Sequence, residues 1–198
     1  MPDLNSISIY MGTFTGDRLA DYCIMTTILD NIDFYSGTER MNMMRKNGVK
    51  HPKDGGSMLY GTTWKGYLSP TKNRTKVKDG VYYTKVRDDN PELYDVFKEY
   101  SSLYFPDFEW GQVQMNKNFI CPPHRDSANI GESILCAFGD FKGGLTCVDL
   151  ESKIRKYDGD MGPVRFNGSK YLHWVESFTG TRYTLVFFHN SSSRKLLK

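Results

Sequence analysis

The chain has 198 residues, of which 39% are hydrophobic and 14% are aromatic, and its formal net charge is +3. This length suits one domain with a substantial core, and the mean hydropathy of -0.53 is that of a soluble globular protein. No run of 18 apolar residues is present, which excludes a transmembrane helix, and the first residues do not resemble a signal peptide. We therefore expect an intracellular protein of the cytoplasm or nucleus that is not secreted and has no membrane partner.

The positive charge is concentrated in one stretch. Residues 46–87 contain ten Lys or Arg and two acidic residues, a local excess of +8, which leaves the remainder at -5. Such asymmetry favours a polyanionic partner such as DNA, and the alternative is a solvated basic loop. Nothing in the sequence indicates an obligate protein partner.

The four cysteines do not form a metal or redox motif. None of them makes a Cys-x-x-Cys pair, which excludes a zinc ribbon and a thioredoxin motif. Without a secretion signal, we expect reduced and mostly buried thiols.

The first half of the chain predicts helices and loops. Residues 7–10 suggest a short strand, and Asp17 is placed to cap a helix whose apolar residues repeat at spacings of three and four. Residues 37–44 are compatible with a second helix or an extended arm. The glycine-rich stretch 46–90 predicts loops with short strands at 58–63 and 81–86.

A further helix is expected at the end of this half. Asn90 is a good N-cap and Pro91 suits the first helical position. An apolar stripe follows: Leu93, Val96, Phe97, Tyr100 and Leu103.

From Trp110 onward the pattern is that of short strands separated by glycine turns, at 142–144, 167–168 and 179–180. The expected strands are 111–116, 133–138, 145–150, 164–166, 171–175 and 182–189. This spacing predicts an antiparallel barrel or sandwich, and two strand sets closing on each other form a jelly roll. We expect a single mainly β domain over 1–198 with flanking helices: residues 1–109 pack on the barrel, 110–190 form its core, and 191–198 are a frayed tail.

His124 and Asp126 stand two residues apart in the stretch Cys-Pro-Pro-His-Arg-Asp. On a strand, such residues share a face and lie about 7 Å apart along the backbone. His173 follows 47 residues after Asp126. Two His and one carboxylate form the facial triad of non-haem Fe(II) oxygenases, which leaves coordination positions open. His189 is a rival ligand, and His51 in the basic loop is expected to be solvated.

Arg182 begins an otherwise apolar strand and shares a strand face with Thr184, Val186 and Phe188. A charged side chain there needs an anionic partner. One interpretation is a structural ion pair or a position at the barrel rim, and the other is a bidentate clamp on a substrate carboxylate.

Together, His124-x-Asp126, His173 and Arg182 resemble the Fe(II)/2-oxoglutarate-dependent dioxygenases, over roughly 110–189. The resemblance implies a double-stranded β-helix, which is a jelly roll. It also implies that the triad binds Fe(II), that Arg182 binds 2-oxoglutarate, that O2 takes the last position, and that ascorbate can serve as reductant.

The run His124-Arg125-Asp126-Ser127-Ala128-Asn129, with the later Phe-Gly-Asp-Phe-Lys-Gly-Gly-Leu, resembles the TET/JBP branch more narrowly. That branch oxidises the 5-methyl group of cytosine or thymine in DNA. The chain lacks the cysteine-rich zinc-binding region of animal TET enzymes and is similar to small single-domain members found in viruses, algae and fungi. The resemblance implies that Asn129 contacts the base. The alternative is that Asn129 only has a structural role, as a turn residue. Arg125 is expected to meet substrate or phosphate, and Asn116 is a candidate contact to the cosubstrate.

Two other functions remain open. The same chemistry could act on a protein side chain or a free small molecule. A cupin-like barrel could instead bind a metal or ligand without turnover, but such a barrel does not need Arg182.

Overall fold

The computed structural model describes residues 14–36, 45, 47–48, 53–64 and 74–194. Its largest element is a five-stranded antiparallel sheet whose spatial order is β1-β5-β13-β6-β10. The strands of this large sheet are β1 (Gly56–Tyr60), β5 (Gln112–Lys117), β13 (Tyr183–Asn190), β6 (Asn129–Phe138) and β10 (Val164–Phe166).

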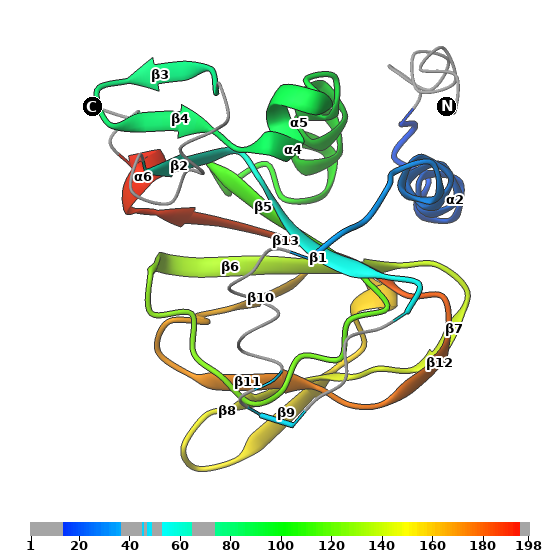
Figure 1. The fold of residues 1–198 in the computed structure, drawn as a ribbon. Coiled ribbons are helices and arrows are strands. Elements are labelled where there is room, and N and C mark those ends of the chain that lie inside the picture. The colour runs from blue at the N-terminus through cyan, green and yellow to red at the C-terminus, as the bar shows by residue number, and fades with distance from the viewer. Residues whose placement is uncertain (1–13, 37–44, 46, 49–52, 65–73, 195–198) are drawn as a thin grey trace.

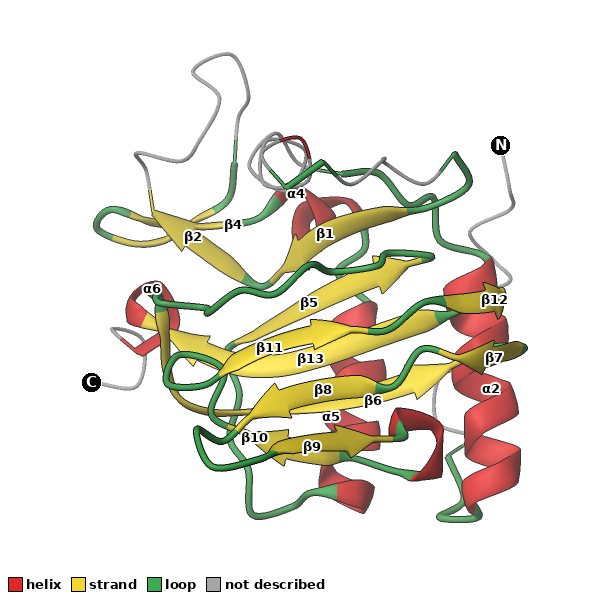
Figure 2. Cartoon of the chain, turned by 90° about the horizontal axis from the view of Figure 1, so that it is seen from below, coloured by secondary structure: helices red, strands yellow, loops and turns green. Residues whose placement is uncertain are grey.

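A smaller antiparallel sheet of order β11-β8-β9 faces the large one (Figure 1). In Figure 2 its strands lie in front of β6, β10 and β13. A two-stranded ribbon of β7 and β12 extends this second layer. These strands are β11 (Leu172–Val175), β8 (Thr146–Asp149), β9 (Ile154–Tyr157), β7 (Phe141–Gly143) and β12 (Phe178–Gly180). The two layers confirm the expected mainly β jelly roll with flanking helices.

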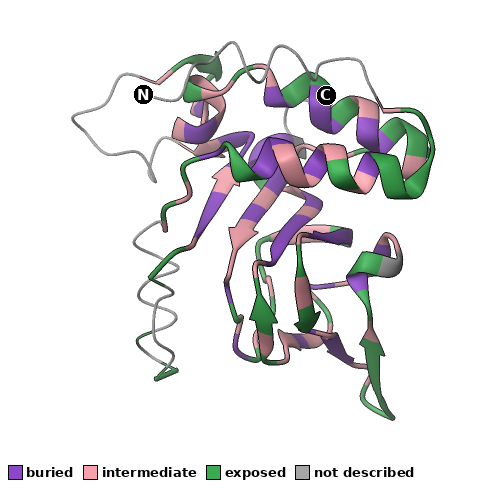
Figure 3. Cartoon of the chain, turned by 90° about the vertical axis from the view of Figure 1, so that its right-hand side faces the viewer, coloured by how far each residue is buried: buried purple, intermediate pink, exposed green. Residues whose placement is uncertain are grey.

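Helices cover the other face of the large sheet (Figure 1). They are α2 (Arg18–Asp30), α4 (Lys85–Asp89) and α5 (Leu93–Tyr104), and a short 3-10 helix, η2 (Gly159–Met161), packs on β6. The buried stripes of α2 and α5 adjoin the buried strands in Figure 3. The odd-numbered residues Tyr183, Leu185 and Phe187 of β13 are fully buried in this helix-facing core. Even-numbered residues therefore point to the other face of the sheet, toward the second layer.

A buried carboxylate ties α2 to α5. Asp21 is fully buried and accepts hydrogen bonds from Thr15 N at 2.8 Å, Gly16 N at 2.9 Å and the Tyr104 hydroxyl at 2.8 Å. Burial by itself raises the pKa of Asp21, but these hydrogen bonds outweigh it and hold the pKa below its ordinary value of 3.8. The stabilisation is therefore present above pH 3.8 and is lost as the pH falls through the folded-state pKa.

Asp21→Asn should lower the free energy of unfolding by about 2 kcal/mol at neutral pH, because an amide nitrogen would then face N–H donors. Denaturant unfolding measures this loss, and the difference from the unmodified protein should shrink in acid. Asp17→Asn is the matched control: Asp17 accepts from Ala20 N as the N-cap of α2, and asparagine caps equally well. An equal loss in both variants would contradict the role assigned to Asp21.

Several expected boundaries in the first half of the chain are wrong. The strand expected at 81–86 ends as β4 (Val81–Tyr83), because the Thr84 side chain accepts from Arg87 N and caps α4. Asn90 is the C-cap of α4 rather than the N-cap of the next helix, and α5 begins at Leu93. Leu103 is 46% exposed and does not belong to the buried stripe of α5.

Two later expectations are also wrong. Residues 179–180 belong to β12, which pairs with β7, rather than to a turn. The segment expected to be a frayed tail begins with the short helix α6 (Ser191–Arg194), in which Ser192 and Ser193 are buried. Asn190 explains this order, because its side-chain oxygen accepts from the backbone N–H groups of both serines.

The region before Trp110 contributes directly to the barrel, since β1 pairs along its whole length with β5. A separate small sheet holds part of the basic stretch: β2 (Thr62–Trp64), β4 and β3 (Lys76–Lys78). The strand expected at 7–10, the segment 37–44, His51 and residues 195–198 lie outside the described residues.

Cys23, Cys121, Cys136 and Cys147 are all free, and two of them, Cys136 and Cys147, are buried. Within the described part of the chain, every helix is too short or too polar to cross a membrane.

Candidate metal centre

The backbone brings the two halves of the candidate site together through a single bridge. His124 N donates to His173 O and His173 N donates to His124 O, each at 3.0 Å. His124 lies in this isolated bridge and not in a regular strand, which corrects the expectation for the His-x-Asp motif. The preceding residues, Pro122 and Pro123, lack the N–H groups that would extend a strand ladder.

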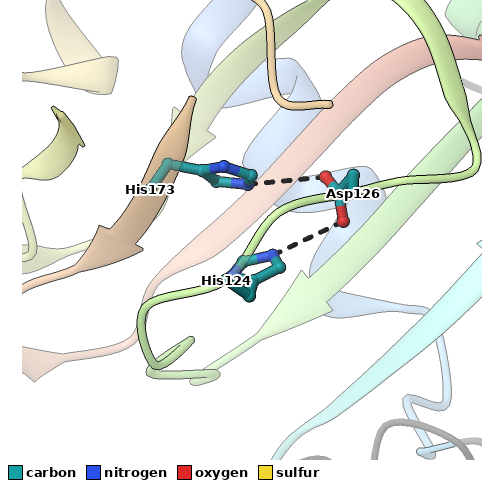
Figure 4. Close-up of side chains that lie close together, drawn as sticks. All are labelled: His124, Asp126 and His173. Carbon is teal, nitrogen blue, oxygen red and sulfur yellow. Dashed lines mark ion pairs between the residues drawn. The ribbon is translucent and has the colours of Figure 1, made fainter. Parts of the chain in front are cut away.

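The three side chains converge on one point (Figure 4). His124 Nε2 lies 3.4 Å from Asp126 Oδ1, and His173 Nε2 lies 3.4 Å from Asp126 Oδ2. One potential ligand atom from each residue lies within 4.8 Å of the other two. Two imidazole nitrogens and one carboxylate oxygen on a single side of a point suit a divalent iron ion with open positions.

The other ring nitrogens fix the orientation of both imidazoles. His124 Nδ1 lies 2.8 Å from Pro122 O, and His173 Nδ1 lies 3.1 Å from Tyr171 O. A carbonyl can only accept, so each Nδ1 is assigned as the protonated nitrogen. Each Nε2 is therefore the nitrogen that faces Asp126, and in the neutral imidazole it offers the lone pair that a metal ligand requires.

The charge balance of the site favours a cation. Burial by itself lowers the pKa of His124, but hydrogen bonds to Asp126 and Cys121 outweigh it and raise the pKa to about 10. The Asp126 carboxylate therefore stabilises a positive charge next to it, on the His124 imidazole. A divalent ion supplies that charge in place of the proton.

A cavity open to solvent, with an empty volume of about 630 Å³, lies beside the three residues. Its walls come from both layers of the jelly roll. The residues that line it are Gln114, Asn116, Phe119, Cys121, His124, Asp126, Asn129, Leu135, Thr146, Phe166, His173, Trp174, Val175, Thr184, Val186 and Phe188.

The predicted site residues divide into those at the cavity and those outside it. Asn116 and Asn129 line the cavity, and Asn129 Nδ2 lies 3.4 Å from Asp126 Oδ2. Arg125 is exposed, and its Nε donates to Lys170 O at 3.0 Å. His189 does not line the cavity, and its Nδ1 lies 3.3 Å from Ser193 Oγ. The sequence reasoning missed Gln114 and Thr184, although both alternate in step with predicted residues on their strands.

Arg182 is 3% exposed and lies between two aromatic rings. Its guanidinium carbon is 5.3 Å from the centroid of Phe141 and 5.6 Å from that of Phe178. Burial lowers its pKa to about 10, while Asp158 and Asp160 partly oppose that shift.

The hydrogen-bonding capacity of Arg182 is only partly used. Its buried Nε and Nη2 have no hydrogen-bond partner among the described residues. Arg182 directly precedes β13 and does not itself line the cavity, but Thr184 and Val186 of that strand do. Burying a hydrogen-bond donor without an acceptor destabilises the fold. A bound carboxylate could accept from both Nε and Nη2.

Gly168 provides space behind two of the candidate metal ligands. A Cβ atom on Gly168 would lie 3.3 Å from both Asp126 Oδ2 and His173 Cε1. Gly168→Val should therefore displace these two ligands and weaken Mn(II) binding about tenfold, as changes around metal ligands do. Anaerobic calorimetric titration measures the affinity.

Gly168→Ala is the graded control for this effect. It adds only the tight Cβ contact and should produce a smaller loss of affinity than valine. Wild-type affinity in the valine variant would show that these side chains do not bind the ion.

No family model and no curated protein matches the sequence. Among solved structures, the chain is similar to NgTET1 in complex with 5mC DNA, with 19% identity, a TM-score of 0.44, and coverage of 79% of this chain and 67% of that one. It is also similar to a 2OG-Fe(II) oxygenase family oxidoreductase from Burkholderia pseudomallei, with 13% identity, a TM-score of 0.42, and coverage of 82% and 98%. A prolyl hydroxylase from Trichoplax adhaerens, in complex with a hypoxia inducible factor peptide, matches with 13% identity, a TM-score of 0.42, and coverage of 98% and 82%. At such low TM-scores these likenesses carry no conclusion about chemistry, which depends on the site itself.

Proposed function

We propose that the protein is an Fe(II)- and 2-oxoglutarate-dependent dioxygenase that hydroxylates a C–H bond. The observation that carries this proposal is the pairing of two features on one jelly roll. His124, Asp126 and His173 offer three ligand atoms to one ion, and the buried Arg182 holds two donors that lack an acceptor. A barrel that only bound a metal ion would not need a buried arginine with two unpaired donors.

One set of residues binds the metal ion and another binds the cosubstrate. Bound Fe(II) and 2-oxoglutarate supply the oxidising chemistry, with O2 as the third reactant. The His124 and His173 imidazoles and the Asp126 carboxylate hold the ion and leave one side of it open. Arg182 binds the far carboxylate of the cosubstrate with its planar fork, and Asn116 contributes an amide N–H at the cavity wall.

For the substrate, we propose the 5-methyl group of cytosine or thymine in DNA. Three observations support this choice. Asn129 places an amide in the cavity beside Asp126, where it can pair with a base edge. Arg125 is exposed one residue from each of two metal ligands, where a phosphate can reach it. The basic stretch 46–87 supplies further positive charge. A base in a duplex would have to flip out to enter the cavity.

The test combines a turnover assay with product analysis. The purified protein is incubated with Fe(II), ascorbate, 2-oxoglutarate and O2, with or without DNA that carries 5-methylcytosine or thymine. Succinate is quantified and the nucleosides are analysed by mass spectrometry. We expect succinate and a base that gains one oxygen atom, and we expect both to be absent in Asp126→Ala.

The outcomes separate the competing functions. Succinate without a modified base would retain the dioxygenase and redirect the search to protein side chains or small molecules. Absence of succinate, in protein shown to bind Fe(II), would indicate a non-catalytic cupin-like barrel. Because phosphate contacts are screened by salt, DNA affinity should also fall steeply as the salt concentration rises.

A further inference from the structure

A row of three polar side chains crosses the large sheet at the wall of the cavity. Ser57 of β1 and Thr184 of β13 lie directly opposite Asn116 of the central strand β5. Ser57 and Thr184 are 1% and 4% exposed. The Ser57 hydroxyl donates to Asn116 Oδ1 at 2.6 Å, and Asn116 Nδ2 donates to Thr184 Oγ1 at 2.9 Å.

The same hydroxyl also holds a second amide of the cavity wall. Gln114 lies two residues before Asn116 on β5 and shares its strand face. Its Nε2 donates to Ser57 Oγ at 3.0 Å. Ser57 therefore contacts both cavity-lining amides of this strand, although it is not itself among the residues that line the cavity.

The single hydroxyl proton of Ser57 couples the orientations of the Asn116 and Gln114 amides. A serine hydroxyl has one proton to donate and lone pairs to accept with. Because the proton of Ser57 goes to the carbonyl of Asn116, Gln114 must turn its nitrogen toward Ser57. Its carbonyl oxygen remains unused among the described residues, as does one N–H of Asn116.

The row of Ser57, Asn116 and Thr184 lies near Arg182, so it is placed to affect a ligand that Arg182 binds. Arg182 directly precedes β13, and Thr184 lies two residues after it, so Asn116 and Thr184 lie next to the Arg182 end of the barrel. Gln114 pairs with Val186, one step farther from Arg182. A carboxylate bound to Arg182 would therefore reach Asn116 before Gln114.

We propose that Ser57 is a positioning residue, which fixes the orientation of the Asn116 and Gln114 amides and so presents an N–H of Asn116 to the anionic cosubstrate. This inference rests on the proposed function for the identity of that ligand. It also makes β1, which lies outside the segment predicted to form the barrel core, a part of the active site.

The first experiment measures binding instead of turnover. 2-Oxoglutarate is titrated calorimetrically into Mn(II)-loaded protein without O2. Ser57→Ala should weaken 2-oxoglutarate binding about tenfold, the value of roughly one hydrogen bond, and leave Mn(II) affinity unchanged. In turnover, KM for 2-oxoglutarate should rise with little change in kcat.

Two further variants separate positioning from packing. Ser57→Cys keeps the shape of the side chain but donates weakly, so it should lose affinity as the alanine variant does. Ser101→Ala removes another buried and hydrogen-bonded hydroxyl, which lies on α5 away from the cavity, and should leave 2-oxoglutarate affinity unchanged. Wild-type affinity in Ser57→Cys, or an equal loss in Ser101→Ala, would overturn the proposal.

A double-mutant cycle tests whether Ser57 acts through the amide. In an Asn116→Ala background, Ser57→Ala should cause little further loss of affinity. A full additional tenfold loss would overturn the proposal.

A readout without any ligand keeps this inference distinct from the proposed function. The side-chain amide resonances of Asn116 and Gln114 should both shift, and exchange faster with water, in Ser57→Ala. If the unmodified protein binds no 2-oxoglutarate, the proposed function fails, and these resonances still decide the role of Ser57. Unchanged resonances for both amides would overturn that role.

Discussion

Asp126→Ala should reduce the affinity for Fe(II) or Mn(II) by at least about 100-fold and abolish turnover, because it removes one of the three proposed ligands. It should not unfold the protein. The backbone N–H of Asp126 still donates to Gly168 O, and the bridge between His124 and His173 involves only backbone atoms. Anaerobic calorimetry gives the metal affinity, and circular dichroism checks that the fold is retained.

Asp107→Ala is the matched control for this substitution. Asp107 is an exposed carboxylate that accepts from Arg165, and it does not line the cavity. Its removal should leave metal affinity unchanged. If Asp126→Ala bound the ion as tightly as the unmodified protein, the carboxylate would only accept hydrogen bonds from the two imidazoles, and the proposed centre would be wrong.

The sequence predicted the convergence of His124 and Asp126 because two residues at that spacing are always neighbours in an extended chain. It did not predict how they are held. The prolines before His124 stop the ladder, and the partner that orients the segment is His173 itself, 49 residues farther along the chain. Short-range periodicity contains no information about such a pairing.

The strand that follows Arg182 was also predictable, since its residues are mostly apolar and β-branched or aromatic, although β13 begins at Tyr183 rather than at Arg182. The aromatic rings around the guanidinium were not. Phe141 and Phe178 come together because β7 pairs with β12, and β12 spans residues that read locally as a turn. Ser57 was missed for a related reason: it contacts Asn116 only because β1 joins the large sheet, and nothing near Ser57 in the sequence indicates that partner.

Arg182→Met should weaken 2-oxoglutarate binding by about 100-fold or more, the usual consequence of removing one member of a buried charge pair. It should leave Mn(II) affinity unchanged. The free protein should be as stable as before, or more stable, because the side chain that is removed is a buried cation with two unsatisfied donors. Calorimetric titration of 2-oxoglutarate and thermal unfolding without ligand measure the two effects.

The opposite signs of these effects separate a ligand-binding arginine from a structural one. An arginine retained for a structural ion pair would destabilise the free protein when removed, because its acidic partner would remain unpaired. Arg165 serves as the matched control, since it pairs with Asp107 at 2.9 Å and Glu132 at 3.7 Å on the surface. Arg165→Met should leave 2-oxoglutarate affinity unchanged. If Arg182→Met unfolded the free protein at a much lower temperature and still bound 2-oxoglutarate normally, Arg182 would be a packing residue, and the anion site would have to lie elsewhere in the cavity.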